Sequence, residues 1–297
     1  MISSIFLFGI ETDYLPYFLI VMFILGAVIG SFLNVVIYRL PLKQSIVFPN
    51  SRCPKCQKAI KPYDNIPIFS WLILLRGKCR ACKAPISIRY PAVEALTGLL
   101  YVAVFYHAGL SFALPFELIL VTALVPLIFI DADHQILPNK ITYPLFVFAI
   151  VSRVVLPLLM NKLYFDDLTP GFIANFSTMH LWAVSLIGGL IGAIAGGGFL
   201  WVVGFLWEKL RGIEAMGLGD VKLMLGLGAF MGWRLTLLTI FLGCLTGALA
   251  GLIKKLKDGD LNLEGKLPFG IFLGAGTIIS LLYGIQIINW YISNFIP

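Results

Sequence analysis

The chain has 297 residues, of which 59% are hydrophobic and 12% are charged, and its mean hydropathy is +0.94. Soluble globular domains carry about 25% charged residues, so this chain has too few polar side chains to cover a water-facing surface. The composition excludes soluble fold classes and predicts an all-α polytopic membrane protein. The net charge of +7 would suit a nucleic-acid partner, but the positions of the basic residues give it another cause.

Apolar segments that are long enough to form membrane-spanning helices recur along the whole chain. A helix needs about 20 mostly apolar residues to cross a bilayer. The sequence predicts about eight spans, at residues 15–38, 91–107, 115–131, 140–160, 180–207, 220–232, 234–253 and 268–293. The sixth is short for a crossing, and the first is expected to be retained because no signal-peptide cleavage pattern precedes it. Residues 1–38 thus form a first transmembrane segment, 39–90 a polar insert and 91–297 a transmembrane core.

The basic residues predict the orientation, because loops rich in Lys and Arg stay in the cytoplasm. Of the 22 Lys and Arg residues, all but Arg153, Lys162 and Arg234 lie in the insert, in loops on its side of the membrane, or at the span ends beside them. The insert is therefore expected to be cytoplasmic and both termini to lie outside. This asymmetry explains the positive charge without nucleic acid.

Glycines gather in the fifth predicted span, residues 180–207. Small residues let membrane helices approach closely, so this run predicts tight helix packing. It does not indicate a cofactor-binding loop, because no strand precedes it.

Four of the five cysteines form two C-x-x-C pairs within the insert, Cys53/Cys56 and Cys79/Cys82. Two such pairs can close a tetrahedral four-thiolate site, the usual arrangement of structural zinc. An insert of this size has little core of its own, so a metal would stabilise it. A redox role is the alternative, although no thioredoxin-like pattern surrounds either pair. Cys244 is expected to be a packing residue in its span.

Residues 65–75, between the two cysteine pairs, form an apolar stretch that is too short to cross a bilayer. Two alternatives remain open. The stretch can lie on the membrane face with Trp71 at the interface, or it can form the small core of the insert.

Two aspartates, Asp131 and Asp220, fall at the predicted cytoplasmic ends of spans. Ionisable residues at such positions are costly and therefore candidates for function. Two carboxylates in a poorly hydrated site do not both ionise easily, so they share a proton. The ionised one can activate a water molecule while the protonated one polarises a peptide carbonyl. The alternatives are a solvated aspartate or, for Asp220, a helix cap. Asp133 and His134 are expected to be solvated or supporting residues.

Several motifs in order along the chain resemble the type IV prepilin peptidases, which are G-x-G-D aspartyl peptidases and N-methyltransferases. The resemblance covers almost the whole chain. It rests on Gly30-Ser-Phe-Leu-Asn34-Val-Val36, Tyr38-Arg-Leu-Pro41, the two cysteine pairs, Asn65-Ile-Pro67, Arg89-Tyr-Pro-Ala-Val-Glu94, Ile130-Asp-Ala-Asp-His-Gln135 and Gly217-Leu-Gly-Asp-Val-Lys222. One departure is Asn139, where many relatives have Asp.

The resemblance implies a bifunctional enzyme of the bacterial cytoplasmic membrane. Such an enzyme cleaves the basic leader of prepilins or prepilin-like secretion proteins on the cytoplasmic side, with Asp131 and Asp220 as the catalytic acids. It then methylates the new N-terminal amine with S-adenosylmethionine. The insert would bind zinc and serve methylation, and Asn34 and Glu94 are candidate cofactor-binding residues. A peptidase without methylation, a transporter or channel, and an assembly protein are the alternatives. The cysteine insert argues against the first, and the lack of an internal repeat against the second.

Overall fold

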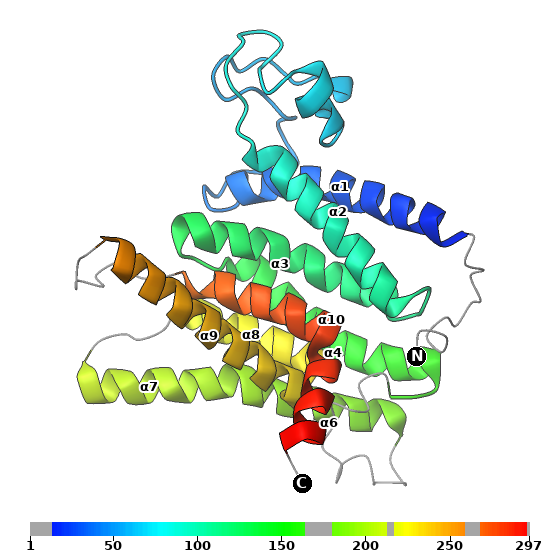
Figure 1. The fold of residues 1–297 in the computed structure, drawn as a ribbon, viewed down its shortest axis with the longest axis vertical. Coiled ribbons are helices and arrows are strands. Elements are labelled where there is room, and N and C mark those ends of the chain that lie inside the picture. The colour runs from blue at the N-terminus through cyan, green and yellow to red at the C-terminus, as the bar shows by residue number, and fades with distance from the viewer. Residues whose placement is uncertain (1–13, 164–179, 213–216, 259–267, 296–297) are drawn as a thin grey trace. The chain divides into compact units, whose positions relative to one another are not determined.

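The structure is a computed structural model that describes residues 14–163, 180–212, 217–258 and 268–295. Figure 1 shows a helical chain with an irregular insert between its first two long helices. The elements are α1 (Leu15–Arg39), η2 (Pro62–Asn65), η3 (Ser70–Leu74), α2 (Arg89–Ala108), α3 (Leu114–His134), α4 (Asn139–Met160), α6 (Leu181–Ala193), η5 (Ile194–Gly198), α7 (Phe199–Arg211), α8 (Leu218–Met231), α9 (Trp233–Asp258) and α10 (Phe269–Phe295). Among the described residues, extended structure is limited to two isolated bridges in the insert.

Each of the eight predicted spans is helical in the structure. Seven helical stretches among the described residues are long and apolar enough to cross a membrane. One of them, Leu181–Arg211, runs through α6, η5 and α7 without a break. The predicted sixth span is α8, which has only 14 residues. The prediction of an all-helical, multi-pass membrane protein is therefore confirmed.

The chain divides into two compact units, Met1–Ile130 and Asp131–Pro297. In the first unit, α1 and α2 touch at backbone distance. A Cβ atom added at Gly26 would lie 2.7 Å from the carbonyl oxygen of Thr97, and one at Gly30 would lie 2.8 Å from Cα of Glu94. This approach brings Asn34 near the start of α2, where its amide donates a hydrogen bond to the Tyr90 carbonyl at 3.0 Å.

In the second unit, α8 packs against α4, α6, η5 and α9. The glycines of the 180–207 run lie against its backbone, as predicted. A Cβ atom at Gly196 would lie 2.6 Å from the Met224 carbonyl oxygen, and one at Gly197 would lie 2.7 Å from that of Val221. Gly192 and Gly228 face each other so closely that neither has room for a Cβ atom. These contacts fix the position of the helix that carries Asp220.

Arg153 on α4 meets the other end of α8. Its side chain is buried, and its Nε donates a hydrogen bond to the Ala229 carbonyl at 2.9 Å. Because α8 is short, its last carbonyl groups lie among other helices rather than in water. A cation beside them is favourable, because they form the negative end of the helix dipole. The helix then stops at Gly232, whose φ of 83° is unfavourable for other residues.

Candidate active site and candidate metal centre

Asp131 and Asp220 line the same cavity, which has a volume of about 260 Å³. Asp131 lies in the last turn of α3 and Asp220 in the first turn of α8. The rest of the lining consists of Gln135, Ile136, Leu137, Asn139, Gly217, Gly219 and Lys222. The structure thus brings together the two acids that the sequence singled out, which stand 89 positions apart in the chain.

The carboxyl group of Asp131 is buried and held by the start of α10. Its Oδ2 accepts a hydrogen bond from the backbone N–H of Ile271 at 3.2 Å, and the residue is only 5% exposed. A Cβ atom at Gly270 would lie 2.8 Å from the same oxygen. The glycine therefore lets the backbone of α10 reach the carboxyl group.

Asp220 is partly exposed toward the cavity, and its backbone N–H donates to the Gly217 carbonyl at 3.0 Å. The N-cap residue of α8 is Gly217, so the alternative in which Asp220 caps the helix is wrong. Two carboxyl groups around one small cavity favour a state in which they share a single proton. Asp133 and His134 are exposed and do not line this cavity, in keeping with their expected minor role.

Lys222 and Asn139 form a polar wall of the same cavity, which reasoning from the sequence did not assign. The Lys222 ammonium donates to Oδ1 of Asn139 at 3.1 Å and lies 5.2 Å from the centre of the Tyr143 ring. Lys222 is the last residue of the Gly217–Lys222 motif, and Asn139 stands where many relatives have Asp. Nothing in the sequence paired them, because 83 positions separate them.

The four cysteines of the insert form one cluster, with all four sulfur atoms within 4.8 Å of one another. The Cys53 and Cys82 sulfurs are 3.8 Å apart, and the Cys56 and Cys79 sulfurs are 4.0 Å apart. A tetrahedral zinc ion with Zn–S bonds of about 2.3 Å requires sulfur atoms about 3.8 Å apart. The cluster therefore has the dimensions of a four-thiolate zinc site, and its cysteines are not joined as disulfides.

The two cysteine pairs lie on equivalent tight turns. The N–H of Cys53 donates to the Lys58 carbonyl at 3.0 Å, and that of Cys79 donates to the Ala84 carbonyl at 2.8 Å. Backbone N–H groups of Cys82 and Ala81 point at the Cys79 sulfur and lower the pKa of its thiol to about 6. A thiol with this pKa is readily ionised to the thiolate that binds metal.

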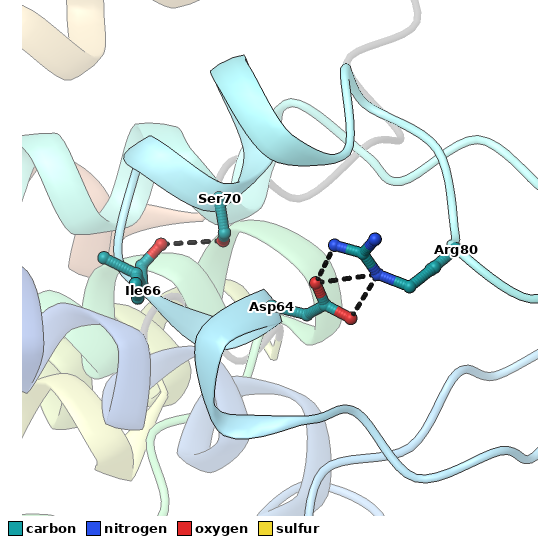
Figure 2. A network of polar contacts seen from close by, with 4 residues as sticks. All are labelled: Asp64, Ile66, Ser70 and Arg80. Atoms are coloured by element: carbon teal, nitrogen blue, oxygen red, sulfur yellow. Dashed lines mark hydrogen bonds and ion pairs between the residues drawn. The ribbon is translucent and has the colours of Figure 1, made fainter.

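A salt bridge joins the second turn to the rest of the insert. Figure 2 shows the guanidinium of Arg80, between Cys79 and Cys82, held by both carboxylate oxygens of Asp64 at 2.6–3.1 Å. Asp64 is buried and belongs to η2. Reasoning from the sequence missed this pair, because neither residue stands out from the other charged residues of the insert.

A larger cavity of about 1050 Å³ lies in the first unit, between the insert and the adjoining ends of α1 and α2. Asn34 and Glu94, the two candidate cofactor residues, both line it, together with Trp71 and the cysteines Cys53 and Cys79. Glu94 is 8% exposed, and its carboxylate accepts a hydrogen bond from the backbone N–H of Ile68 at 2.7 Å. The structure therefore brings these two residues to one cavity, with the buried acid at its helical end.

Two family profiles match adjoining parts of the chain. One is described as the bacterial peptidase A24 N-terminal domain and matches residues 24–108. The other is described as the type IV leader peptidase family and matches residues 118–252.

Curated proteins named prepilin leader peptidase/N-methyltransferase are similar to almost the whole chain. The one from Aeromonas hydrophila is 38% identical, over 94% of this chain and 95% of the relative. The one from Pseudomonas aeruginosa is 37% identical over 93% of each, and the one from Legionella pneumophila is 33% identical over 93% of this chain and 96% of the relative. No solved structure is significantly similar to the chain.

Proposed function

The chain belongs to the type IV leader peptidase family, and on this basis we propose that it is a bifunctional enzyme of the bacterial inner membrane. It cleaves the leader peptide of type IV prepilins or prepilin-like secretion proteins, and it then N-methylates the new N-terminal residue. Relatives from three bacterial genera that align end to end carry both activities in their names. The distribution of Lys and Arg supports an active site that faces the cytoplasm.

The observation that carries the peptidase proposal is the shared cavity of Asp131 and Asp220. The ionised carboxylate takes a proton from a water molecule, whose oxygen attacks the carbonyl carbon of the scissile peptide bond. The protonated carboxyl group donates a hydrogen bond to the carbonyl oxygen and stabilises the charge that develops there. When the C–N bond breaks, the departing amine takes a proton from the acid pair, and no covalent intermediate is formed.

The groups around the two acids support a mechanism with one ionised and one protonated carboxyl group. The Ile271 N–H fixes one oxygen of Asp131, and Gly217 and Gly219 leave space in the lining for a substrate backbone. Lys222 places a positive charge at the same cavity. A cation near two carboxylates favours the singly ionised state over the neutral one.

For methylation, the proposed site is the cavity of about 1050 Å³ that Asn34 and Glu94 line. Its volume leaves room for a ligand of the size of S-adenosylmethionine, and ligand sites of this kind combine apolar walls with a few polar groups. Bound there, S-adenosylmethionine would supply the methyl group. The Glu94 carboxylate would hold the new terminal ammonium and accept the proton that it must lose, and Asn34 would contribute polar contacts.

The four-cysteine cluster is proposed to hold a structural zinc ion. Four thiolates leave no open position on a tetrahedral metal, which argues against catalysis at the metal. Cys53 and Cys79 also line the methylation cavity, so a metal there would shape one of its walls. We also propose a division of the chain into a first span (1–38), a methylation-associated insert (39–90) and a peptidase core (91–297). Asn34 and Glu94 then belong to the span ends that flank the insert and join it in lining the methylation cavity.

The experiment that tests the peptidase proposal is co-expression of Asp131→Asn and Asp220→Asn variants with a prepilin precursor. We expect each variant to be inserted in the membrane and to lose leader cleavage, because an amide cannot exchange the proton. Mass spectrometry of the precursor N-terminus reads the result. Asp133→Asn is the matched control, since Asp133 does not line the cavity, and it should cleave normally. Retained cleavage in both Asp131→Asn and Asp220→Asn would rule out the acid pair.

A further inference from the structure

The insert exposes an unusually apolar segment, residues 66–75. The large side chains of this segment that are 42–60% exposed are Ile66, Phe69, Leu72, Ile73 and Leu74. The alternative in which this stretch forms the core of the insert is therefore wrong for these side chains. Contiguous exposed apolar surface of this kind marks a site of contact with another molecule or with a membrane.

The polar groups of the same segment turn inward. Ser70 is buried, and its hydroxyl donates to the Ile66 carbonyl at 2.7 Å, as Figure 2 shows. The Trp71 indole N–H donates to the Ile86 carbonyl at 3.1 Å. Ser70, Trp71 and Leu75 also line the methylation cavity. One face of the segment is thus a cavity wall, and the other carries apolar side chains.

A hydrogen bond sets the depth of the segment relative to α2. The Ile68 N–H donates to the carboxylate of Glu94, which lies five residues after the start of α2 at Arg89. At 1.5 Å per residue, five residues correspond to about 7.5 Å along the helix axis. Since α2 is one of the membrane-spanning candidates, residues 66–75 lie beside its first turns rather than far out in the water. Ile88, the residue directly before α2, is likewise an exposed apolar side chain, at 71%.

We infer that residues 66–75 are an interfacial segment that contacts the lipid bilayer, with Phe69, Leu72 and Ile73 among the acyl chains at its edge. Two exposed basic residues, Arg76 and Lys78, follow directly and suit the phosphates of anionic headgroups. Amphipathic segments with apolar residues on one side and basic residues at the margin bind membranes in this way. The bilayer then supports one wall of the methylation cavity. The inference rests on α2 crossing the membrane and not on the chemistry of either proposed activity.

The test uses the full-length protein in vesicles of phosphatidylethanolamine and phosphatidylglycerol, without precursor. An environment-sensitive fluorescent amino acid replaces Phe69, Leu72 or Ile73, one at a time, and zinc content confirms that each insert has folded. Lipids with brominated acyl chains should quench each probe several-fold more strongly than aqueous iodide does. The same probe at Lys83, an exposed residue of the second cysteine turn, is the matched control and should show the opposite preference.

Stronger quenching by iodide at all three positions would overturn the inference. Two other occupants of the surface give distinct results. If a second copy of the chain covers it, protection from iodide should disappear when the vesicles contain one protein each. If the precursor covers it, protection should appear only when precursor is added. Either result counts against lipid contact, and neither depends on whether cleavage or methylation occurs.

Discussion

At the scale of single residues, Gly270 shows how little space surrounds the proposed catalytic acids. It lies in the first turn of α10, where an added Cβ atom would lie 2.8 Å from Oδ2 and 3.0 Å from Cγ of Asp131. The neighbouring N–H of Ile271 bonds the same oxygen. The carboxyl group is therefore positioned by backbone, which a side chain at residue 270 would displace.

We expect Gly270→Ala to lower kcat/KM for leader cleavage by roughly 10- to 100-fold, because displacements of about 1 Å at a catalytic group have effects of this size. Purified enzyme and a precursor peptide in detergent give the measurement. Gly247→Ala is the control, since a Cβ atom there meets only the Phe272 ring, at 3.4 Å or more. Equal activity of the two variants would show that the contact with α10 does not position Asp131.

At the scale of elements, the position of α8 depends on direct contacts between its backbone and that of α6. Nine of its 14 residues are buried, yet it is too short to be fixed by crossing the bilayer on its own. Gly192 and Gly228 replace side-chain packing by direct backbone contact, and Arg153 bonds the carbonyl of Ala229. Small residues at such crossings are the usual means of packing membrane helices, because lipid gives little hydrophobic driving force between them.

Gly192→Ala should therefore destabilise the protein, because the new methyl group has no space unless α6 and α8 separate. Overpacking of this kind costs about 1–3 kcal/mol. The expected result is a fall of several degrees in the midpoint of thermal unfolding in detergent. Gly198→Ala serves as the control, since the nearest atom to a Cβ there is a side-chain carbon of Ile194 at 3.4 Å. An unchanged midpoint for Gly192→Ala would contradict the packing shown in the structure.

The insert is an element of a different kind, because its core is the cysteine cluster. Removing two ligands with Cys53→Ser and Cys56→Ser should abolish zinc binding, whereas Cys244→Ser, outside the cluster, should leave one zinc ion per chain. Elemental analysis of purified protein gives the metal content. Equal zinc in both variants would exclude the cluster as the ligand set. None of these substitutions replaces Asp64 or Arg80, whose salt bridge joins the second cysteine turn to η2.

At the scale of the whole molecule, the sequence predicted the seven helical stretches of the described residues that can cross a membrane, and physical reasons explain this agreement. The role of Asp131 and Asp220 as catalytic acids stays a prediction. A bilayer allows only helices and closed barrels to cross it, so long apolar runs have few alternatives. Charged residues are rare in this chain, so Asp131 and Asp220 stood out at the ends of their spans. The C-x-x-C spacing likewise predicted the geometry of the cysteine cluster.

Contacts between distant segments could not be predicted in the same way. The hydrogen bond from Ile271 to Asp131 joins residues 140 positions apart, and nothing in the composition of α10 indicates it. The apolar stretch 66–75 was ambiguous for another reason. A buried core and a lipid-facing surface require the same residue types, so only the exposure of the side chains separates the two alternatives.

The two proposed activities use cavities with no lining residue in common, one in each compact unit, so they should be separable by mutation. Glu94→Gln keeps an acceptor for the Ile68 N–H but cannot take a proton or pair with an ammonium. We expect it to lower methylation by roughly 100- to 10,000-fold, the scale of a lost general base, and to leave cleavage intact. Asp220→Asn should lose cleavage but still methylate a precursor that is supplied already cleaved.

Mass spectrometry of the substrate N-terminus measures both reactions in one sample. Glu208→Gln, at an exposed position of α7, is the matched control and should retain both. Removal of zinc should affect methylation more than cleavage, because Cys53 and Cys79 line only the methylation cavity. A parallel loss of both reactions in Glu94→Gln would mean that Glu94 maintains the fold rather than serving methyl transfer. The methylation site would then have to be sought elsewhere in the chain.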